Sequence, residues 1–130
     1  MRIGSIGLGN MSGAILRGVI NNGFMSPENI CGYDIDTDKL RAFAEDTGIK
    51  ALASNADVAA QSDVVLLAVK PNDFPAMLAS ISDGILRKKP LLLSIATGTS
   101  IASLKEWLGD DAGEVPIVRI IRDLEILAKS

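Results

Sequence analysis

A glycine-rich stretch near the start of the chain holds the residues whose spacing points most directly to chemistry. It reads Ile6-Gly7-Leu8-Gly9-Asn10-Met11-Ser12, after a short apolar run and before a helical pattern of apolar residues. Glycines at such a turn let the backbone approach a pyrophosphate, and the helix start offers free N–H donors and a partial positive charge. The spacing therefore predicts a dinucleotide site, with Ser12 where glycine or alanine is more usual; an ordinary tight turn is the alternative.

An acidic residue follows the second predicted strand. Asp34 lies 25 positions after Gly9 (34 minus 9), close to the spacing of about 20 residues at which a carboxylate meets the adenosine ribose hydroxyls. A carboxylate there favours NAD over NADP, although Thr37 and Lys39 are placed to accommodate a 2′-phosphate. A simple turn that Asp34 forms with Asp36 is the structural alternative.

Three other segments at the ends of predicted strands complete the candidate site. Val69-Lys70-Pro71 ends the fourth strand, where the proline keeps Lys70 extended and directs it over a ligand or into solvent. The small residues Ala96, Thr97 and Gly98 close the fifth strand and leave room for a nicotinamide ring. Asn55 is predicted to cap the third helix, and its amide could also contact adenine.

These loops must be positioned by strands that alternate with helices. The strand candidates are residues 2–6, 29–33, 50–53, 63–69, 91–96 and 116–121. The helices between them are predicted to begin near Gly9, at Asp36 or Thr37, near residue 56, at Asn72 and at Ser100. This alternation predicts an α/β fold, a Rossmann-type doubly wound parallel sheet in three αβα layers. Residues 63–69 are apolar on both faces, as at the centre of such a sheet, and ligands bind where the strands' carboxyl ends converge.

Composition excludes several classes of function. The chain has no histidine, so a histidine base, a histidine-containing zinc site and a Ser-His-Asp triad are absent, and we expect no metal site. The net charge of −3 comes without a long block of Lys or Arg, which argues against nucleic acid. The apolar runs are too short to span a membrane. With Cys31 as its single cysteine, the protein is expected to be cytoplasmic, and Cys31 and Trp107 are interpreted as packing residues.

Three motifs together resemble one known family. The segments Ile6-Gly7-Leu8-Gly9-Asn10-Met11, Ala68-Val69-Lys70-Pro71 and Ser94-Ile95-Ala96-Thr97-Gly98-Thr99-Ser100-Ile101, at this spacing, are similar to the amino-terminal half of pyrroline-5-carboxylate reductase. The resemblance runs from Met1 to about Ile121. It implies that residues 6–11 hold the pyrophosphate, Asp34 the adenosine ribose, Asn55 the adenine end, and residues 68–71 with 96–98 the nicotinamide half.

The resemblance also implies an activity and shows where this chain departs from it. The family reduces the cyclic imine 1-pyrroline-5-carboxylate to proline with NADPH or NADH. From Arg122 the family pattern is lost, so we divide the chain into an NAD(P)-binding domain, 1–121, and a helix-prone tail, 122–130. The family's helical carboxyl-terminal domain, which dimerises and completes the substrate pocket, has no counterpart here. We therefore expect cofactor binding, no catalytic side chain within the chain, and little or no imine reduction.

Two other readings stay open. The same scaffold serves coenzyme-F420-dependent reductases and β-hydroxyacid dehydrogenases, because a fold alone does not determine a function. A nucleotide-responsive or purely structural module is the non-enzymatic alternative, and it would form homo-oligomers through exposed apolar surface. The sequence also leaves open whether the cofactor is NADP or NAD.

Overall fold

A six-stranded parallel sheet forms the centre of the protein. The computed structural model describes residues 1–95 and 117–119. The strands are β1 (Ile3–Ile6), β2 (Ile30–Tyr33), β3 (Lys50–Ala51), β4 (Val64–Leu67), β5 (Leu91–Ser94) and β6 (Ile117–Arg119). Their order is β3-β2-β1-β4-β5-β6, and every pair is parallel. This is the Rossmann order, with the topological switch point between β1 and β4.

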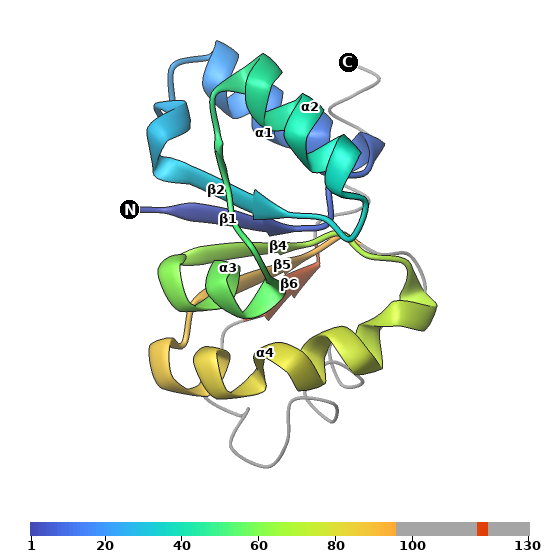
Figure 1. The fold of residues 1–130 in the computed structure, drawn as a ribbon. Coiled ribbons are helices and arrows are strands. Elements are labelled where there is room, and N and C mark those ends of the chain that lie inside the picture. The colour runs from blue at the N-terminus through green and yellow to red at the C-terminus, as the bar shows by residue number, and fades with distance from the viewer. Residues whose placement is uncertain (96–116, 120–130) are drawn as a thin grey trace.

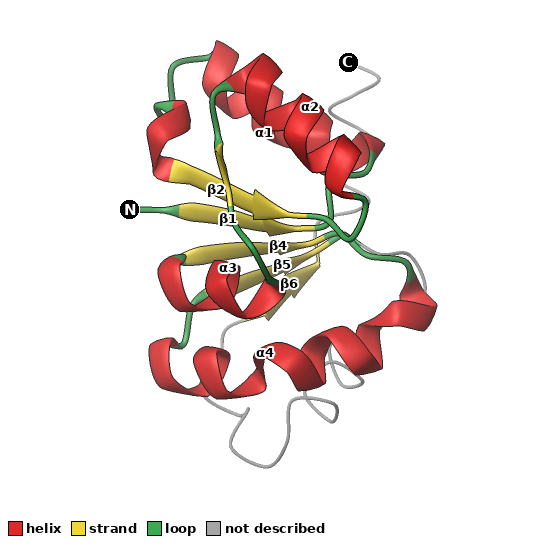
Figure 2. Ribbon diagram, in the orientation of Figure 1, coloured by secondary structure: helices red, strands yellow, loops and turns green. Residues whose placement is uncertain are grey.

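Helices cover both faces of this sheet (Figures 1 and 2). One face carries α1 (Asn10–Asn21) and α2 (Thr37–Thr47), and the other carries α3 (Asn55–Gln61) and α4 (Phe74–Lys88). Short 3₁₀ turns, Pro27–Asn29 and Pro71–Asp73, precede β2 and α4. The predicted three-layer αβα architecture is confirmed.

Strand β4 contributes to the apolar cores on both sides of the sheet. Val65 and Leu67 pack with the core beneath α3 and α4, while Leu66 joins the core beneath α1 and α2. None of these three side chains is more than 2% exposed. A strand that is apolar on both faces is thus buried on both, as its composition predicted.

Helix α2 begins and ends where its sequence predicted. The side chain of Asp36 accepts a hydrogen bond of 3.1 Å from the backbone N–H of Lys39, which caps the first turn. Gly48 ends the helix in the left-handed conformation, with φ of 85°. Leu40 and Phe43 form its buried stripe.

Two other predicted caps are wrong. Ser54, not Asn55, caps α3, because the extended Ser54 places its Oγ 3.1 Å from the N–H of Asp57. Before α4, a 3₁₀ turn closes between Lys70 O and Asp73 N at 2.9 Å, which moves the helix start beyond Asn72. Asp73 occupies the N-cap position without a side-chain capping bond.

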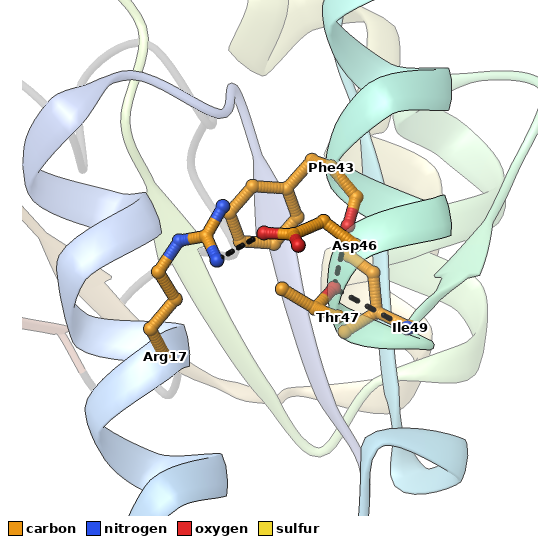
Figure 3. A network of polar contacts seen from close by, with 5 residues as sticks. All are labelled: Arg17, Phe43, Asp46, Thr47 and Ile49. Atoms are coloured by element: carbon orange, nitrogen blue, oxygen red, sulfur yellow. Dashed lines mark hydrogen bonds and ion pairs between the residues drawn. The ribbon is translucent and has the colours of Figure 1, made fainter.

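Polar contacts link the two helices on the α1 side of the sheet (Figure 3). Arg17 of α1 forms an ion pair with Asp46 of α2. Its guanidinium also lies 4.9 Å from the centroid of the Phe43 ring, within the range of a cation–π contact. The Thr47 hydroxyl donates to the Phe43 carbonyl over 2.7 Å at the end of α2. These contacts connect the helix that follows the glycine turn to its neighbour.

Several predictions fall on parts of the chain that the structure does not describe. They concern the helix from Ser100, the packing of Trp107 and the tail, 122–130. Within the described ranges, no helix is long and apolar enough to cross a membrane. Cys31 is buried, with its Sγ 3.3 Å from the Ser62 Oγ, which confirms it as a packing residue.

Candidate dinucleotide-binding site

Gly7 occupies the switch point of the sheet and meets the chain that leaves β4. It adopts φ of 93°, a conformation that L side chains rarely take. A Cβ added to Gly7 would lie 2.8 Å from the Ala68 carbonyl oxygen. The Gly7 N–H donates to Tyr33 O over 2.8 Å, and the Ala68 N–H donates to Ile6 O over 2.9 Å. The loops after β1, β2 and β4 therefore converge, as predicted, and only glycine fits where they meet.

Two buried serines support this turn from inside. The Gly7 carbonyl accepts hydrogen bonds from the Ser5 Oγ at 2.6 Å and from the Ser12 Oγ at 3.2 Å. Ser12 also lies 3.3 Å from the Gly9 carbonyl, and both serines are fully buried. Ser12, the third small residue of the motif, thus fits beneath the turn, and its single hydroxyl hydrogen is shared between two nearby carbonyl oxygens.

Gly9 is placed quite differently from Gly7. It is the exposed N-cap residue of α1, with φ of −74° and ψ of −175°, which any residue can adopt. A Cβ added to it would meet no atom of the described residues within 4 Å. No side chain caps α1, and its first turn contains no acidic residue. The N–H groups of this first turn thus lack a side-chain cap, and the space beside Gly9 could admit a second molecule that accepts their hydrogen bonds.

Asp34 connects the glycine turn to the end of β2. Its Oδ2 accepts a hydrogen bond of 2.8 Å from the Leu8 N–H, and its Oδ1 accepts one of 2.8 Å from the Asp36 N–H. The side chain is half-buried. Asp34 thus forms the turn with Asp36, and its carboxylate lies beside the glycine turn, while its contact with the adenosine ribose stays a prediction.

The structure adds one residue that the sequence reasoning missed. Ile35 is 89% exposed, although isoleucine is usually buried. It lies between Asp34 and Asp36, whose bond across it forms the turn. The signal in the sequence was a single isoleucine between two turn-forming aspartates, outside any strand or helix pattern.

The other predicted site residues differ in their exposure and in their distance from the glycine turn along the chain. Val69 is half-buried against the core, Lys70 is exposed, and Pro71 begins the 3₁₀ turn before α4. Asn55 is the half-buried first residue of α3. Ala96, Thr97 and Gly98 lie outside the described residues.

A groove between α2 and β3 lies apart from the glycine turn. It has a volume of about 400 Å³ and is lined by Thr37, Leu40, Arg41, Ala44, Glu45 and Ala51. It includes Thr37, the first residue of α2, but neither Asp34 nor the glycine turn. The convergence of loops and free helix donors, not this groove, defines the candidate site.

Comparisons with known proteins agree with this geometry. A model of the family described as NADP oxidoreductase coenzyme F420-dependent matches residues 2–98. Pyrroline-5-carboxylate reductase of Glycine max is 37% identical over 110 residues, which cover 84% of this chain and 39% of the relative. The enzyme of that name from Escherichia coli is 39% identical over 110 residues, which cover 85% of this chain and 40% of the relative. The chain thus spans about two fifths of the length of these relatives.

Solved structures show similarity to the same enzymes. A pyrroline-5-carboxylate reductase from Coxiella burnetii superposes with a TM-score of 0.81 at 35% identity, over 91% of this chain and 42% of that one. Plasmodium falciparum pyrroline carboxylate reductase with NADP bound has a TM-score of 0.76 at 29% identity, over 92% and 41%. The predicted resemblance is confirmed: the chain belongs to the family of NADP oxidoreductase coenzyme F420-dependent domains and corresponds to the amino-terminal part of pyrroline-5-carboxylate reductases.

Proposed function

We propose that this chain is the dinucleotide-binding part of an NAD(P)-dependent reductase of the pyrroline-5-carboxylate reductase type. The observation that carries the proposal is the Gly7 turn, packed on Ala68 at the switch point and followed by a helix start that no side chain caps. Open parallel sheets bind ligands at this point, outside the carboxyl ends of the strands. The proposed binding domain is 1–121, with 122–130 as a separate tail.

The pyrophosphate is proposed to lie at the start of α1. Its oxygens would accept hydrogen bonds from the free backbone N–H groups of the first turn, including those of Asn10 and Met11, where the helix dipole favours negative charge. The missing side chain at Gly9 leaves space for this approach. The residues present therefore fit the diphosphate of NAD or NADP.

The two ends of the dinucleotide are assigned as the family resemblance implies. Asp34 and Asn55 would hold the adenosine, and Ala68–Pro71 with Ala96–Gly98 would contact the nicotinamide half. When bound, the nicotinamide supplies the hydride, and these residues bind and orient it. Hydride transfer needs the reacting atoms about 3 to 3.5 Å apart. We propose a cyclic imine, 1-pyrroline-5-carboxylate, as the acceptor because the matching relatives are named for it.

Parallel titrations of the chain with NADH and NADPH, followed by nucleotide fluorescence and calorimetry, test the site. We expect saturable binding that Gly9→Val weakens at least about tenfold, because its side chain would fill the space next to the helix donors. Gly18→Ala is the matched control, since Gly18 is also in open space but lies along α1 away from its start. Absence of binding of either nucleotide at millimolar concentration would refute the proposal and leave the structural-module reading.

A turnover assay tests how much of the activity this chain supports. No side chain of these 130 residues is proposed to be catalytic, and about three fifths of each matched relative has no counterpart in them. We expect turnover far below the usual range of roughly 1 to 1000 per second. A rate within that range would show that the chain holds a complete site. Self-association and a cytoplasmic location belong to the same proposal, and size-exclusion chromatography with light scattering would test the first.

The family description favours one second candidate. It names coenzyme F420, so transfer of hydride between NADP and that coenzyme is the alternative reaction. Consumption of NADPH with coenzyme F420 but not with the cyclic imine would select this candidate.

A further inference from the structure

The corner between β2 and α2, residues 34–36, holds its carboxylate in a fixed position. Asp34 Oδ2 is tied to the Leu8 N–H and Oδ1 to the Asp36 N–H, each at 2.8 Å. A carboxylate that accepts two hydrogen bonds from backbone donors on different segments cannot rotate away without leaving one of them unpaired. An ionised carboxylate has about four acceptor positions, so two remain for another donor. The negative charge of Asp34 is therefore a fixed feature of the predicted adenosine site.

Within the described residues, no ion pair involves Asp34. The two ion pairs in the described part of the chain join Arg17 to Asp46 and Lys88 to Asp63, and neither is at this corner. The start of α2, which could otherwise bind a phosphate, already has its Lys39 N–H bonded to the Asp36 carboxylate. The corner thus presents the carboxylates of Asp34 and Asp36 side by side at the predicted adenosine end of the site.

We infer that this chain takes NAD(H) and discriminates against NADP(H), although its family description and the Plasmodium neighbour name NADP. The inference rests on the proposed function and concerns the same site. The ribose hydroxyls of NAD are donors that suit the free acceptor positions of Asp34. A 2′-phosphate has no donor to offer when ionised and brings about −1.5 to −2 charges toward a fixed negative group.

Direct comparison of the two nucleotides tests the inference without any variant. We expect NADH to bind at least about tenfold more tightly than NADPH, which corresponds to about 1.4 kcal/mol. Equal binding, or tighter binding of NADPH, would overturn the inference and leave the proposed dinucleotide site standing. Failure of both nucleotides to bind would instead refute the proposed function, so the two failures are distinguishable.

Two variants locate the preference in this corner. Asp34→Asn keeps an acceptor oxygen but removes the charge, so the NADH-to-NADPH preference should fall toward one. Asp83→Asn is its matched control, because Asp83 is an exposed aspartate on α4, outside the proposed site, and this change should leave the preference unaltered. A preference that persists in Asp34→Asn would contradict the role of its carboxylate.

The second variant, Ile35→Arg, leaves the Asp34 side chain itself unchanged. Ile35 is 89% exposed, so Ile35→Arg should fold normally while adding a cation that suits a 2′-phosphate. NADPH affinity should rise severalfold relative to NADH. Unchanged relative affinity in a folded Ile35→Arg protein would show that the 2′-position does not lie at this corner, which also overturns the inference.

Discussion

Two aspartates at opposite ends of the sheet tie neighbouring segments together in similar ways. At the amino end, Asp63 accepts a hydrogen bond of 2.8 Å from the Arg2 N–H and lies 3.5 Å from the Lys88 Nζ. At the carboxyl end, Asp34 accepts two backbone hydrogen bonds, but among the described residues no cation forms an ion pair with it. The charge of Asp63 is balanced within the chain, whereas that of Asp34 is available to a ligand. Both aspartates thus join neighbouring segments, but only the one at the carboxyl end of the sheet keeps a charge that is unpaired among the described residues and that a ligand could contact.

The largest effect on stability is expected at the carboxyl end, from Gly7→Ala. The positive φ costs about 1 to 2 kcal/mol for a residue with a Cβ, and the contact with the Ala68 carbonyl adds about 1 to 3 kcal/mol. Urea unfolding should therefore show a loss of about 2 to 5 kcal/mol, together with a loss of nucleotide binding. Gly18→Ala, in an open position of α1, should instead stabilise the chain by about 0.5 to 1 kcal/mol. A wild-type unfolding midpoint for Gly7→Ala would mean that the turn relaxes freely.

A smaller loss is expected from Ser12→Ala beneath the same turn. The change removes the hydroxyl that donates to the Gly7 carbonyl, which keeps its bond to Ser5. Because no acceptor is left wholly unpaired at Gly7, the cost should be that of one net hydrogen bond, about 1 kcal/mol. Unfolding of the Ser12→Ala and Ser12→Gly variants would separate the hydroxyl from the packing of Cβ. If Ser12→Ala is as stable as the wild type, the serine only fills space.

At the amino end, Asp63→Asn should change stability in a pH-dependent way and leave nucleotide affinity unaltered. The backbone hydrogen bond from Arg2, with a smaller contribution from Lys88, lowers the pKa of Asp63 below its ordinary value of 3.8, against the opposing effect of desolvation. The group therefore contributes stability above pH 3.8, and this contribution is lost as the pH falls through the lowered pKa. The variant should be less stable than the wild type at pH 7, and the difference should shrink below pH 3.8. Unfolding curves from pH 2 to pH 7 test this, and a difference that widens in acid would contradict it.

The smallest effect is expected from Arg17→Met, on the outer face of α1. Arg17 and Asp46 have side chains that are 47% and 61% exposed, so solvent screens their ion pair. Together with the lost cation–π contact to Phe43, the cost should not exceed about 1 kcal/mol. Thermal unfolding at low and high salt would measure it, with the ionic part disappearing at high salt. A loss of several kcal/mol would instead make this network a main support of the α1–α2 layer.

Most of the fold could be predicted because its signals are local. The apolar runs at the strands, the Asp36 cap and the Gly48 stop each depend on residues a few positions apart. The errors at Asn55 and Asn72 arose where two adjacent residues were both good caps. Propensity alone cannot choose between such neighbours, since the choice depends on the backbone path into the helix.

The candidate site was predicted in outline, and only part of its geometry followed from spacing. The glycine motif and Asp34 were found by their distances along the chain, but the motif did not distinguish the roles of its glycines. The structure shows that Gly7 is required by internal packing and that Gly9 is not. The exposure of Ile35 was missed, because its place between two turn-forming aspartates marks a turn but does not say what surrounds the side chain in three dimensions.

The sequence by itself determined the order of strands and helices, the position of the glycine turn and the candidate carboxylate. These follow from periodicity, turn chemistry and the needs of single helix ends, all of which act over a few residues. Only the tertiary structure decided that Gly7 packs on Ala68 and that Asp34 is tied to the Leu8 N–H. Those contacts join residues 61 (68 minus 7) and 26 positions apart. They exist only once the parallel sheet brings the ends of β1, β2 and β4 to one edge.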